Sequence, residues 1–425
     1  MSKRVLDLRV NQEWKETEIG RIPKEWQIVK FGELLRGKTF NGIYKPKQFH
    51  GFGIRIVNMG ELFAYGKIGD QKMKLLALTE RERENYLLYS GDLIFARRSL
   101  IASGAGKCSL IIDHSTPMTF ESSIIKARPD TKKAIPAFLY YFFNSAYGRY
   151  VMGTILRQVA VSGITSKDLI NLHLPVPTLP EQKAIAKILS SLDDKIDILH
   201  RQNKTLEEMA DTLWRKMFID EADKRWKIMK LDEICNLITD GKHGDCQNED
   251  DSGYFFISAK DVIGGSISYD NARQITKADF EEIDRRTRLS AGDILITNSG
   301  TIGRMAIVRD TPKTRRTTFQ KSVAILKPNL ERVTSYFLYC LLRANNKIII
   351  DLAGGTTQQN LLLGDLRKFE FTYPEFNLIN QYDNIVSNWF NKMFANDFQI
   401  YLLTSLRDSL LPKLMSGEIR VKDMC

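Results

Sequence analysis

The sequence predicts an α+β protein made of two tandem-repeated globular domains that are separated by two long antiparallel coiled-coil helices. Three observations predict it. The 425-residue chain repeats itself after about 200 residues, each copy has short β-like runs followed by helical segments, and each copy ends in a long heptad-patterned stretch. We place the segments at 1–180 (first domain), 181–218 (first long helix), 219–374 (second domain) and 375–425 (second long helix and tail).

The repeat consists of similar segments in the same order. The segment EWQIVKFGEL at 25–34 returns as RWKIMKLDEI at 225–234, and the Gly-Asp pair at 91–92 returns, followed by an apolar run, at 292–293. A near-constant offset with preserved order indicates a tandem duplication.

Each copy begins with β-like segments. The runs at 55–59 and 91–96 are short, apolar and bounded by glycine and polar turn residues, as strands are. Helical segments follow at 137–150 in the first copy and 335–352 in the second. This order is typical of an α+β domain.

The two long helices are predicted from heptad spacing. Residues 181–218 follow Pro180, contain no glycine or proline, and place apolar residues alternately four and three positions apart for about five heptads. At 1.5 Å per residue this helix is about 57 Å long. The same rows recur 197 residues later, where Asn396 and Arg407 interrupt them. We expect the helices to pair in antiparallel orientation and to separate the domains.

Two asparagines interrupt the predicted seam. Antiparallel pairing centred on the repeat places Asn203 and Asn396 two residues on either side of the midpoint, so we expect them to meet. A buried Asn pair lowers stability but fixes helix register. The alternative is that either Asn faces solvent.

Composition excludes several classes of protein. The chain is 43% hydrophobic and 27% charged, with no apolar run near 20 residues and no signal-peptide core at its start, so we expect a cytoplasmic protein without membrane association. Five scattered cysteines argue against a disulfide framework. Residues 1–180 carry 27 basic and 16 acidic side chains, which accounts for the whole net charge of +11. A polyanionic partner fits this charge.

No catalytic motif is convincing. A P-loop, an amino-methyltransferase signature and a nuclease site all lack essential residues. His243 and Cys246, with Cys235 upstream, would be three zinc ligands without a fourth, so we favour an incidental thiol and histidine. We expect no catalytic residues and no metal.

Three motifs carry a family resemblance. They are TEIGRIPKEW at 17–26, LPVPTLPEQKAI at 174–185 and LLPKLMSGEI at 410–419. With the duplication, they make the chain resemble the specificity subunit of a type I restriction-modification system. Two segments depart from the family pattern, NLINQ at 377–381 and VSGIT at 161–165.

The resemblance implies a function and partners. Each globular copy would be a target-recognition domain that reads one half of a bipartite, asymmetric site in double-stranded DNA, and the paired helices would set the spacer between the halves. Two modification (methyltransferase) subunits would dock on the helical region, and restriction subunits would join through them. The chain itself would be non-catalytic and without cofactor, because S-adenosylmethionine, ATP and Mg²⁺ would be bound by the partner subunits.

Candidate DNA-binding residues cluster near predicted strand ends. Arginine can pair with guanine and asparagine with adenine, whereas lysine more often contacts phosphate. For the first half-site we choose Lys38, Lys45, Lys47, Arg97, Arg98 and Lys107. For the second we choose Lys242, Asn298, Arg304, Arg315, Arg316 and Lys321. The alternative for each is a solvated surface charge.

An aromatic face on the second long helix is the candidate docking surface for other subunits. It comprises Trp389, Phe390, Phe394 and Phe398. The alternative is burial against the neighbouring domain.

Two rival functions remain open. A coiled-coil scaffold with two protein-interaction domains would bind no DNA, and a stand-alone enzyme would transfer methyl groups without partners. The charge distribution further predicts that the first domain supplies more of the salt-dependent affinity for DNA.

Overall fold

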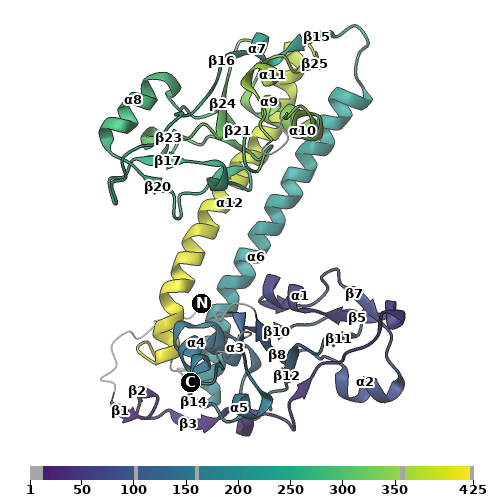
Figure 1. The fold of residues 1–425 in the computed structure, drawn as a ribbon, viewed down its shortest axis with the longest axis vertical. Coiled ribbons are helices and arrows are strands. Elements are labelled where there is room, and N and C mark those ends of the chain that lie inside the picture. Colours follow the sequence, from purple (N-terminus) through teal and green to yellow (C-terminus); the bar gives the residue numbers. More distant parts are fainter. Residues whose placement is uncertain (1–12, 100–103, 158–161, 355–358, 422–425) are drawn as a thin grey trace, which may run out of the picture. The chain divides into compact units, whose positions relative to one another are not determined.

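The computed structural model describes residues 13–99, 104–157, 162–354 and 359–421. The chain divides into two compact units, residues 1–198 with 399–425, and residues 199–398. Each unit therefore contains one globular domain and one half of each long helix (Figure 1). The linear segments expected from the sequence differ from these units because both long helices contribute to both.

The first domain is built around a five-stranded sheet. Its order is β4 (Phe40–Asn41), β12 (Ile124–Ala127), β8 (Leu93–Ala96), β10 (Cys108–Ile111), β6 (Lys67–Ile68). A three-stranded sheet has the order β11 (Met118–Phe120), β5 (His50–Val57), β7 (Lys74–Leu76). The two-stranded pairs are β1 (Trp14–Thr17) with β2 (Gly20–Pro23), β3 (Gln27–Lys30) with β14 (His173–Val176), and β9 (Arg98–Ser99) with β13 (Ser162–Gly163). The helices are η1 (Phe31–Leu34), η2 (Lys47–Phe49), α1 (Met59–Ala64), α2 (Glu80–Tyr86), α3 (Pro136–Asn144), α4 (Ala146–Gly153) and α5 (Ser166–Ile170).

The second domain repeats this plan. Its four-stranded sheet has the order β16 (Cys235–Asp240), β24 (Val323–Pro328), β21 (Ile294–Thr297), β22 (Met305–Ile307). Its three-stranded sheet has the order β20 (Arg273–Gln274), β17 (Phe255–Ile257), β23 (Thr317–Phe319). The two-stranded pairs are β15 (Lys227–Lys230) with β25 (Glu370–Tyr373), and β18 (Val262–Ile263) with β19 (Ser266–Ile267). The helices are α7 (Leu231–Ile234), η5 (Ala259–Asp261), α8 (Lys277–Thr287), η6 (Thr314–Arg316), α9 (Ser335–Ala344), α10 (Asn346–Asp351) and α11 (Leu363–Arg367).

Buried apolar strands hold each domain together. Every residue of β8 and of β21 is buried, as expected for central strands of β-branched, leucine and phenylalanine residues. Under the sheet of the first domain, Phe31, Phe95 and Phe143 meet edge to face, with ring centroids 5.0 to 5.8 Å apart. Such pairs add about 0.5–1.5 kcal/mol beyond their burial.

The repeated Gly-Asp pair forms the same turn before both central strands. Gly91 has φ +91° and Gly292 has φ +89°, a left-handed conformation that favours glycine. The Asp92 carboxylate accepts the Tyr89 N–H at 2.9 Å and pairs with Arg128 at 2.6 Å. Asp293 likewise accepts the Ser290 N–H at 2.9 Å and pairs with Lys327. The duplication therefore extends to individual side-chain contacts.

The long helices are α6 (Leu179–Arg215), continued by a π-helical turn at Lys216–Asp220, and α12 (Phe376–Ser416). The helix α6 begins two residues before the expected start, with Pro180 in its first turn, where a missing N–H is tolerated. Residues 417–421 are not helical and form the described part of the tail.

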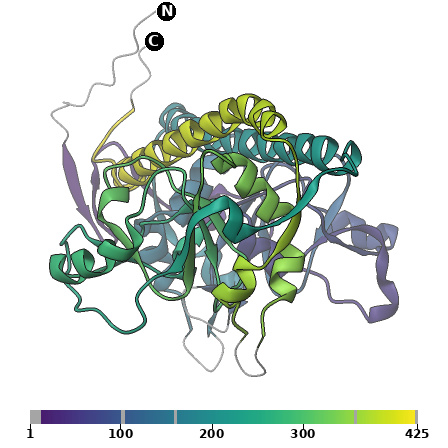
Figure 2. The same cartoon turned by 90° about the horizontal axis from the view of Figure 1, so that it is seen from above.

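The two helices pair in antiparallel orientation within each unit (Figure 2). In the first unit, the beginning of α6 packs on the end of α12, through Ile185 and Leu189 against Leu414. In the second unit, the end of α6 packs on the beginning of α12, where the Tyr382 hydroxyl donates to the Ala210 carbonyl at 3.1 Å. The structure thus has the expected α+β class, with two tandem domains and a long antiparallel helix pair. No helix in the described parts of the chain is long and apolar enough to cross a membrane.

Candidate functional site

Arg97 and Asn298 occupy equivalent positions at the exits of β8 and β21. The Arg97 N–H donates to the Ser123 carbonyl at 2.8 Å, and the Arg97 carbonyl accepts the Ile164 N–H at 3.0 Å. Asn298 repeats both bonds, donating to the Ser322 carbonyl at 3.0 Å and accepting the Leu361 N–H at 2.8 Å. The two domains therefore hold different side chains in the same backbone frame.

In the first domain this strand exit presents two guanidinium groups. Arg97 is half-buried, and the only hydrogen bond of its guanidinium group among the described residues is one of 3.4 Å to the Ser122 carbonyl. Arg98 is exposed on β9 and is paired with Gly163 of the neighbouring strand β13. The neighbouring Gly104 lies against Ser99, because a Cβ at Gly104 would sit 2.3 Å from the Ser99 hydroxyl. The predicted grouping of both arginines with the glycine-rich loop is present.

The second strand exit requires a correction. Asn298 is only 7% exposed, so its amide is not at the surface and does not have the access to a base edge that the sequence suggested. Its Oδ1 atom has no hydrogen-bond partner among the described residues. Arg304, the counterpart of Lys107 in the hairpin, is exposed and makes one long contact of 3.5 Å to the Ala259 carbonyl. Arg304 is therefore the accessible group at this exit.

Two lysines chosen in the first domain are structural. The Lys45 side chain is 9% exposed, pairs with Glu82 at 2.7 Å, and donates to the Ala77 carbonyl at 3.0 Å. Lys107 donates to the Phe63 carbonyl at 2.7 Å, and burial, with a smaller contribution from Arg149, lowers its pKa. These ammonium groups are directed into the domain, which corrects their assignment to phosphate contacts. Lys38 and Lys47 are exposed, as a phosphate role requires.

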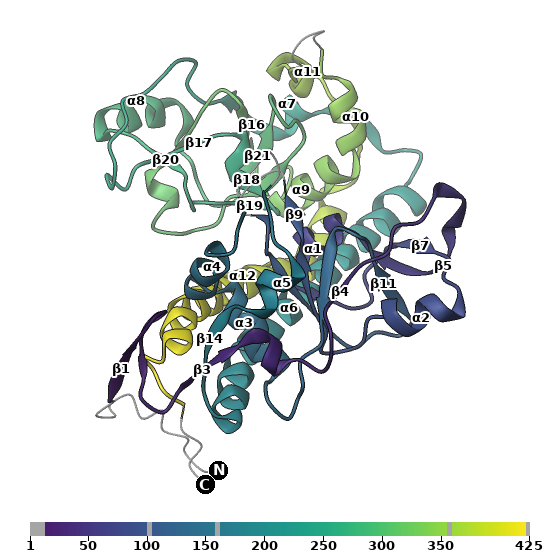
Figure 3. The same cartoon turned by 60° about the horizontal axis from the view of Figure 1, so that its bottom comes forward.

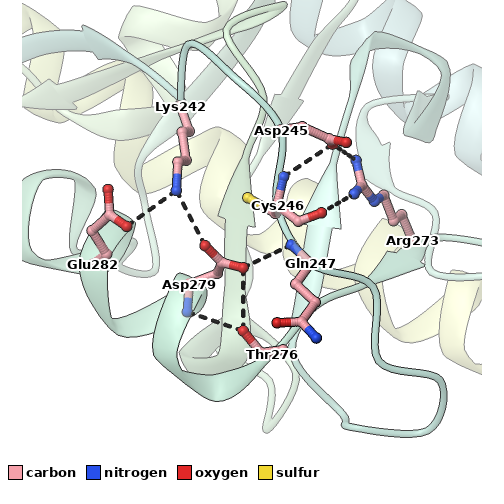
Figure 4. Close-up of polar contacts among 8 residues, drawn as sticks. All are labelled: Lys242, Asp245, Cys246, Gln247, Arg273, Thr276, Asp279 and Glu282. Carbon is pink, nitrogen blue, oxygen red and sulfur yellow. Dashed lines mark hydrogen bonds and ion pairs between the residues drawn. The ribbon is translucent and has the colours of Figure 1, made fainter.

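Lys242 is likewise committed to the protein (Figure 4). Its ammonium lies 3.1 Å from both Asp279 and Glu282, and the hydrogen bonds to Glu282 and Asp279 raise its pKa. Asp279 also accepts the Gln247 N–H at 2.8 Å, the bond that contributes most to lowering its pKa. Arg273 joins the network by pairing with Asp245 at 2.7 Å. The network anchors the 242–248 segment to α8, so the phosphate role expected for Lys242 is corrected to a structural one.

The remaining candidates of the second domain are exposed. Lys321 follows β23 and is exposed, as is Arg315, whose side chain is 80% exposed and lies 3.8 Å from Asp310. Arg316 lies over the Tyr254 ring, 5.7 Å from its centroid. These three cations retain hydrogen-bonding capacity for an anionic partner.

The two seam asparagines meet within the second unit. The Asn396 Nδ2 donates to the Asn203 Oδ1 at 2.8 Å, and Asn396 is fully buried. The predicted contact is confirmed. The Asn203 Nδ2 in turn donates to Asp397 at 2.6 Å, and Asp397 also pairs with Arg309 of the globular domain. The asparagines thus belong to a polar cluster that also includes the second domain.

Most of the expected aromatic docking face is packed inside the second unit. Phe390 is 2% exposed and stacks on Tyr336 with centroids 4.7 Å apart. Phe394 is covered by the Arg309 guanidinium at 4.1 Å, and Trp389 packs on the same core. Only Phe398 of the four is largely exposed, at 62%. Phe390 and Phe394 therefore pack against the neighbouring domain, whereas Trp389 is only partly buried and lies beside residues of α6.

Exposed apolar side chains on α12 occur elsewhere, in the first unit. Tyr401, Leu402 and Leu406 are 58%, 49% and 46% exposed. The heptad pattern did not reveal them, because all three lie outside its two rows. Large apolar residues off the seam of a coiled coil are the signal that would have found them.

The three sequence motifs converge in the first unit. The Trp26 indole N–H donates to Glu181 at 3.2 Å, and Glu181 pairs with Arg420 through hydrogen bonds of 2.5 and 2.8 Å. Glu181 and Arg420 are buried, at 5% and 9% exposure. These contacts join the start of the first domain, the start of α6 and the segment after α12, where β3, β14 and the end of α12 gather (Figure 3).

The possible zinc ligands are not grouped. His243 contacts Asp240 at 2.8 Å, and Cys246 is buried. In the described residues no cluster of three or more His, Cys, Asp or Glu side chains has a geometry suited to a metal ion.

The fold and the site define a class of protein with two similar but non-identical domains, the first of them basic, on a shared antiparallel helix pair. The family model described as "Type I restriction modification DNA specificity domain" matches residues 23–208 and 223–382. The chain therefore belongs to this family and contains two copies of its domain. As a member, it is a non-catalytic specificity subunit of a type I restriction-modification system.

Individual relatives agree with this assignment. The MjaIX specificity subunit of Methanocaldococcus jannaschii is 25% identical over 456 aligned positions that cover 99% of both chains. The EcoKI specificity subunit of Escherichia coli is 25% identical over 53% of this chain and 49% of that subunit. The crystal structure of a type I system S subunit from M. genitalium has the same fold, with a TM-score of 0.58 and 17% identity over 94% of this chain and 97% of that one.

Proposed function

We propose that each globular domain reads one half of a bipartite, asymmetric sequence in double-stranded DNA, and that the helix pair sets the spacer between the halves. One observation carries the proposal. The two domains have the same strand-exit frame but present different accessible cations there, Arg97 and Arg98 in the first domain and Arg304 in the second. Because base recognition depends on side-chain chemistry, two such surfaces would read different sequences.

The accessible cations at these exits support direct contact with DNA. Arg97 and Arg98 in the first domain and Arg304 in the second have few partners within the described residues. Each guanidinium presents several N–H donors that can pair with guanine or with phosphate. By contrast, Lys45, Lys107 and Lys242 bind carboxylate or carbonyl groups of their own domains and have structural roles.

The polar cluster in the second unit supports a role for the helix pair in register. The Asn396 Nδ2 can donate to the Asn203 Oδ1 only when α6 and α12 are aligned so that the two residues lie opposite each other. In an apolar seam, any other alignment would leave buried amide groups unpaired, at about 1–3 kcal/mol each. A fixed helix register would give a fixed spacer.

We further propose that modification subunits dock on the apolar side chains that the helices leave uncovered. On the part of α12 that belongs to the first unit these are Tyr401, Leu402 and Leu406, which replace the packed aromatic residues as the candidate surface. Restriction subunits would join through the modification subunits. The partner subunits, rather than this chain, would bind S-adenosylmethionine, ATP and Mg²⁺.

Methylation mapping with the assembled complex tests the reading surface. Replacing Arg97 and Arg98 by Ala should make the methylated motif degenerate in one half while the other half and the spacer are kept. As a matched control, replacing the exposed Lys30 and Lys132 by Ala removes the same charge from the same domain and should leave the motif unchanged.

An unchanged motif in the arginine variant would refute this placement of the reading surface. Failure of the unaltered complex to methylate any bipartite sequence would refute the proposed function itself. Retention of the unaltered chain on heparin at low salt would argue against the scaffold alternative, which requires no DNA contact.

A further inference from the structure

The second domain contains an open hollow lined by basic side chains. Its volume is about 440 Å³, and its lining residues are Gly253, Phe255, Pro312, Lys313, Arg315 and Arg316. Three of the six lining residues are cations and none is acidic. The cations lie in and just before η6, the short helix that leads into β23.

The charges of this hollow are largely uncompensated. Among the described residues, Lys313 and Arg316 have no carboxylate within 4.0 Å, and Arg315 has only the exposed Asp310 at 3.8 Å. Other cations of the same domain are paired closely, such as Lys327 with Asp293 and Lys242 with two carboxylates. The hollow therefore brings together three cations that have little negative charge close to them.

Aromatic rings support two of these cations without neutralising them. The Lys313 ammonium lies 5.0 Å from the Tyr269 centroid and 5.5 Å from that of Phe255, and these two rings pack edge to face at 4.9 Å. Arg316 lies over Tyr254. A cation held over a ring keeps its charge and its N–H donors, so the head groups are positioned before a ligand arrives.

The segment of the first domain that corresponds to η6 has no equivalent of these three cations. Parallel pairing aligns Phe255 with Thr317 in the second domain and Arg55 with Met118 in the first, so Lys313–Arg316 correspond to His114–Pro117. The sequence of that segment is His-Ser-Thr-Pro, without lysine or arginine. The two copies thus share the parallel strand pairing, but only the second copy has cations in the segment before the second strand.

We infer that the hollow binds backbone phosphate of the DNA next to the second half-site. This inference rests on the proposed function. The hollow lies near the strand exit of the second domain. Arg316 is six residues before Ser322, whose carbonyl accepts the Asn298 N–H, so at most about 20 Å of extended chain separates them. This distance corresponds to about six base pairs of duplex. Three adjacent cations without acidic neighbours suit a polyanion, and phosphate contacts carry affinity without carrying sequence.

The salt dependence of binding tests the inference in the assembled complex. The test variant is Lys313→Gln, Arg315→Gln, Arg316→Gln, and the measurement is the slope of log affinity against log salt concentration for a duplex that contains the methylated motif. This slope is negative, and its magnitude should decrease by about one for each phosphate that the variant no longer binds. Affinity at low salt should fall at least tenfold, while the motif stays the same. The control Lys224→Gln, Lys227→Gln, Lys230→Gln removes three exposed cations near and within β15 and should keep the parental slope.

Specific results would overturn the inference. They are a triple variant with the parental slope, a control with an equal loss, or a changed motif, which would make these residues base readers. Lys313→Arg should keep most of the slope, and equal thermal midpoints of all variants would exclude unfolding as the cause. If the parental complex showed no sequence-specific binding, the proposed function would fail together with this inference, whereas a parental slope in the triple variant would remove the inference alone.

Discussion

Asn396 donates its side-chain amide to Asn203 across the helix pair of the second unit, and Asn203 donates to Asp397, which also binds Arg309. The cluster therefore links α6, α12 and the second domain through hydrogen bonds between side chains. It leaves the Asn396 Oδ1 without a partner among the described residues, so it costs stability as well as fixing position.

Asn203→Leu should destabilise the protein by about 1–3 kcal/mol, because it leaves the buried Asn396 Nδ2 with only a 3.4 Å contact to the Gln202 side chain and removes a donor from Asp397. The double variant Asn203→Leu, Asn396→Leu should recover most of this loss. Urea unfolding measures both. The double variant should also methylate sites with more than one spacer length, and a single unchanged spacer would show that the asparagines do not fix the register.

Asp92→Ala should destabilise the first domain by about 2 kcal/mol. The substitution removes a fully buried carboxylate that caps the Tyr89 N–H and binds Arg128 through two hydrogen bonds. Asp113→Ala, at an exposed position, is the control and should change stability by less than about 0.5 kcal/mol. Equal urea midpoints for the two variants would contradict a structural role of the repeated Gly-Asp turn.

Lys126 should make stability depend on alkaline pH. Burial lowers the pKa of Lys126 from 10.5 to about 8, although Asp92 partly opposes the shift. Because the folded-state pKa lies below the unfolded value, the contribution of Lys126 to stability is most favourable above pH 10.5 and is lost as pH falls through about 8. The free energy of unfolding should therefore rise between these values relative to Lys126→Met, and parallel curves for the two proteins would refute the assignment.

Tyr401→Ser with Leu402→Ser should leave folding intact, because both side chains are more than 45% exposed in the first unit. The variant should lose association with modification subunits by at least tenfold, as large apolar side chains dominate such interfaces. Thr205→Ser with Thr212→Ser, on the exposed side of α6, is the control. Co-purification at matched concentrations distinguishes them, and equal recovery would place docking elsewhere.

Arg420→Met should destabilise the first unit by about 3 kcal/mol, because it leaves the buried Glu181 carboxylate with only the Trp26 indole as a side-chain donor. Lys413→Met, at an exposed position near the end of α12, is the control. Thermal unfolding followed by circular dichroism reports the difference, and coincident curves would show that the ion pair is dispensable.

Much of this architecture follows from sequence pattern alone. The duplication, the antiparallel helices and the Asn203 contact with Asn396 depend on periodicity and on a constant offset, which a single sequence displays. The availability of individual cations does not follow, because their partners lie far along the chain. Lys107 binds the carbonyl of Phe63, and Lys242 binds Asp279. No local pattern separates these lysines from the exposed Lys38.

The aromatic face of α12 shows a similar limit. Phe390 and Phe394 widen the apolar face of the helix whether they meet a partner subunit or their own domain, and the sequence pattern is the same in both cases. Tyr336 and Arg309, which cover them, lie more than 50 residues earlier in the chain. The three-dimensional packing was needed to decide between the two.

The ion pair between Glu181 and Arg420 bears on the order in which the protein folds during synthesis. Residues 199–398 form a continuous unit, which can close once they have left the ribosome. The first unit needs residues 399–421, which are translated after the whole of the second unit, although it contains the first domain. The usual N-terminal-first order of multidomain folding is thus reversed for the final step. Until Arg420 emerges, Glu181 has no ion-pair partner and the apolar face at the start of α6 is not covered by α12. A chain that ended before Arg420 would therefore have a complete second unit and an incomplete first unit.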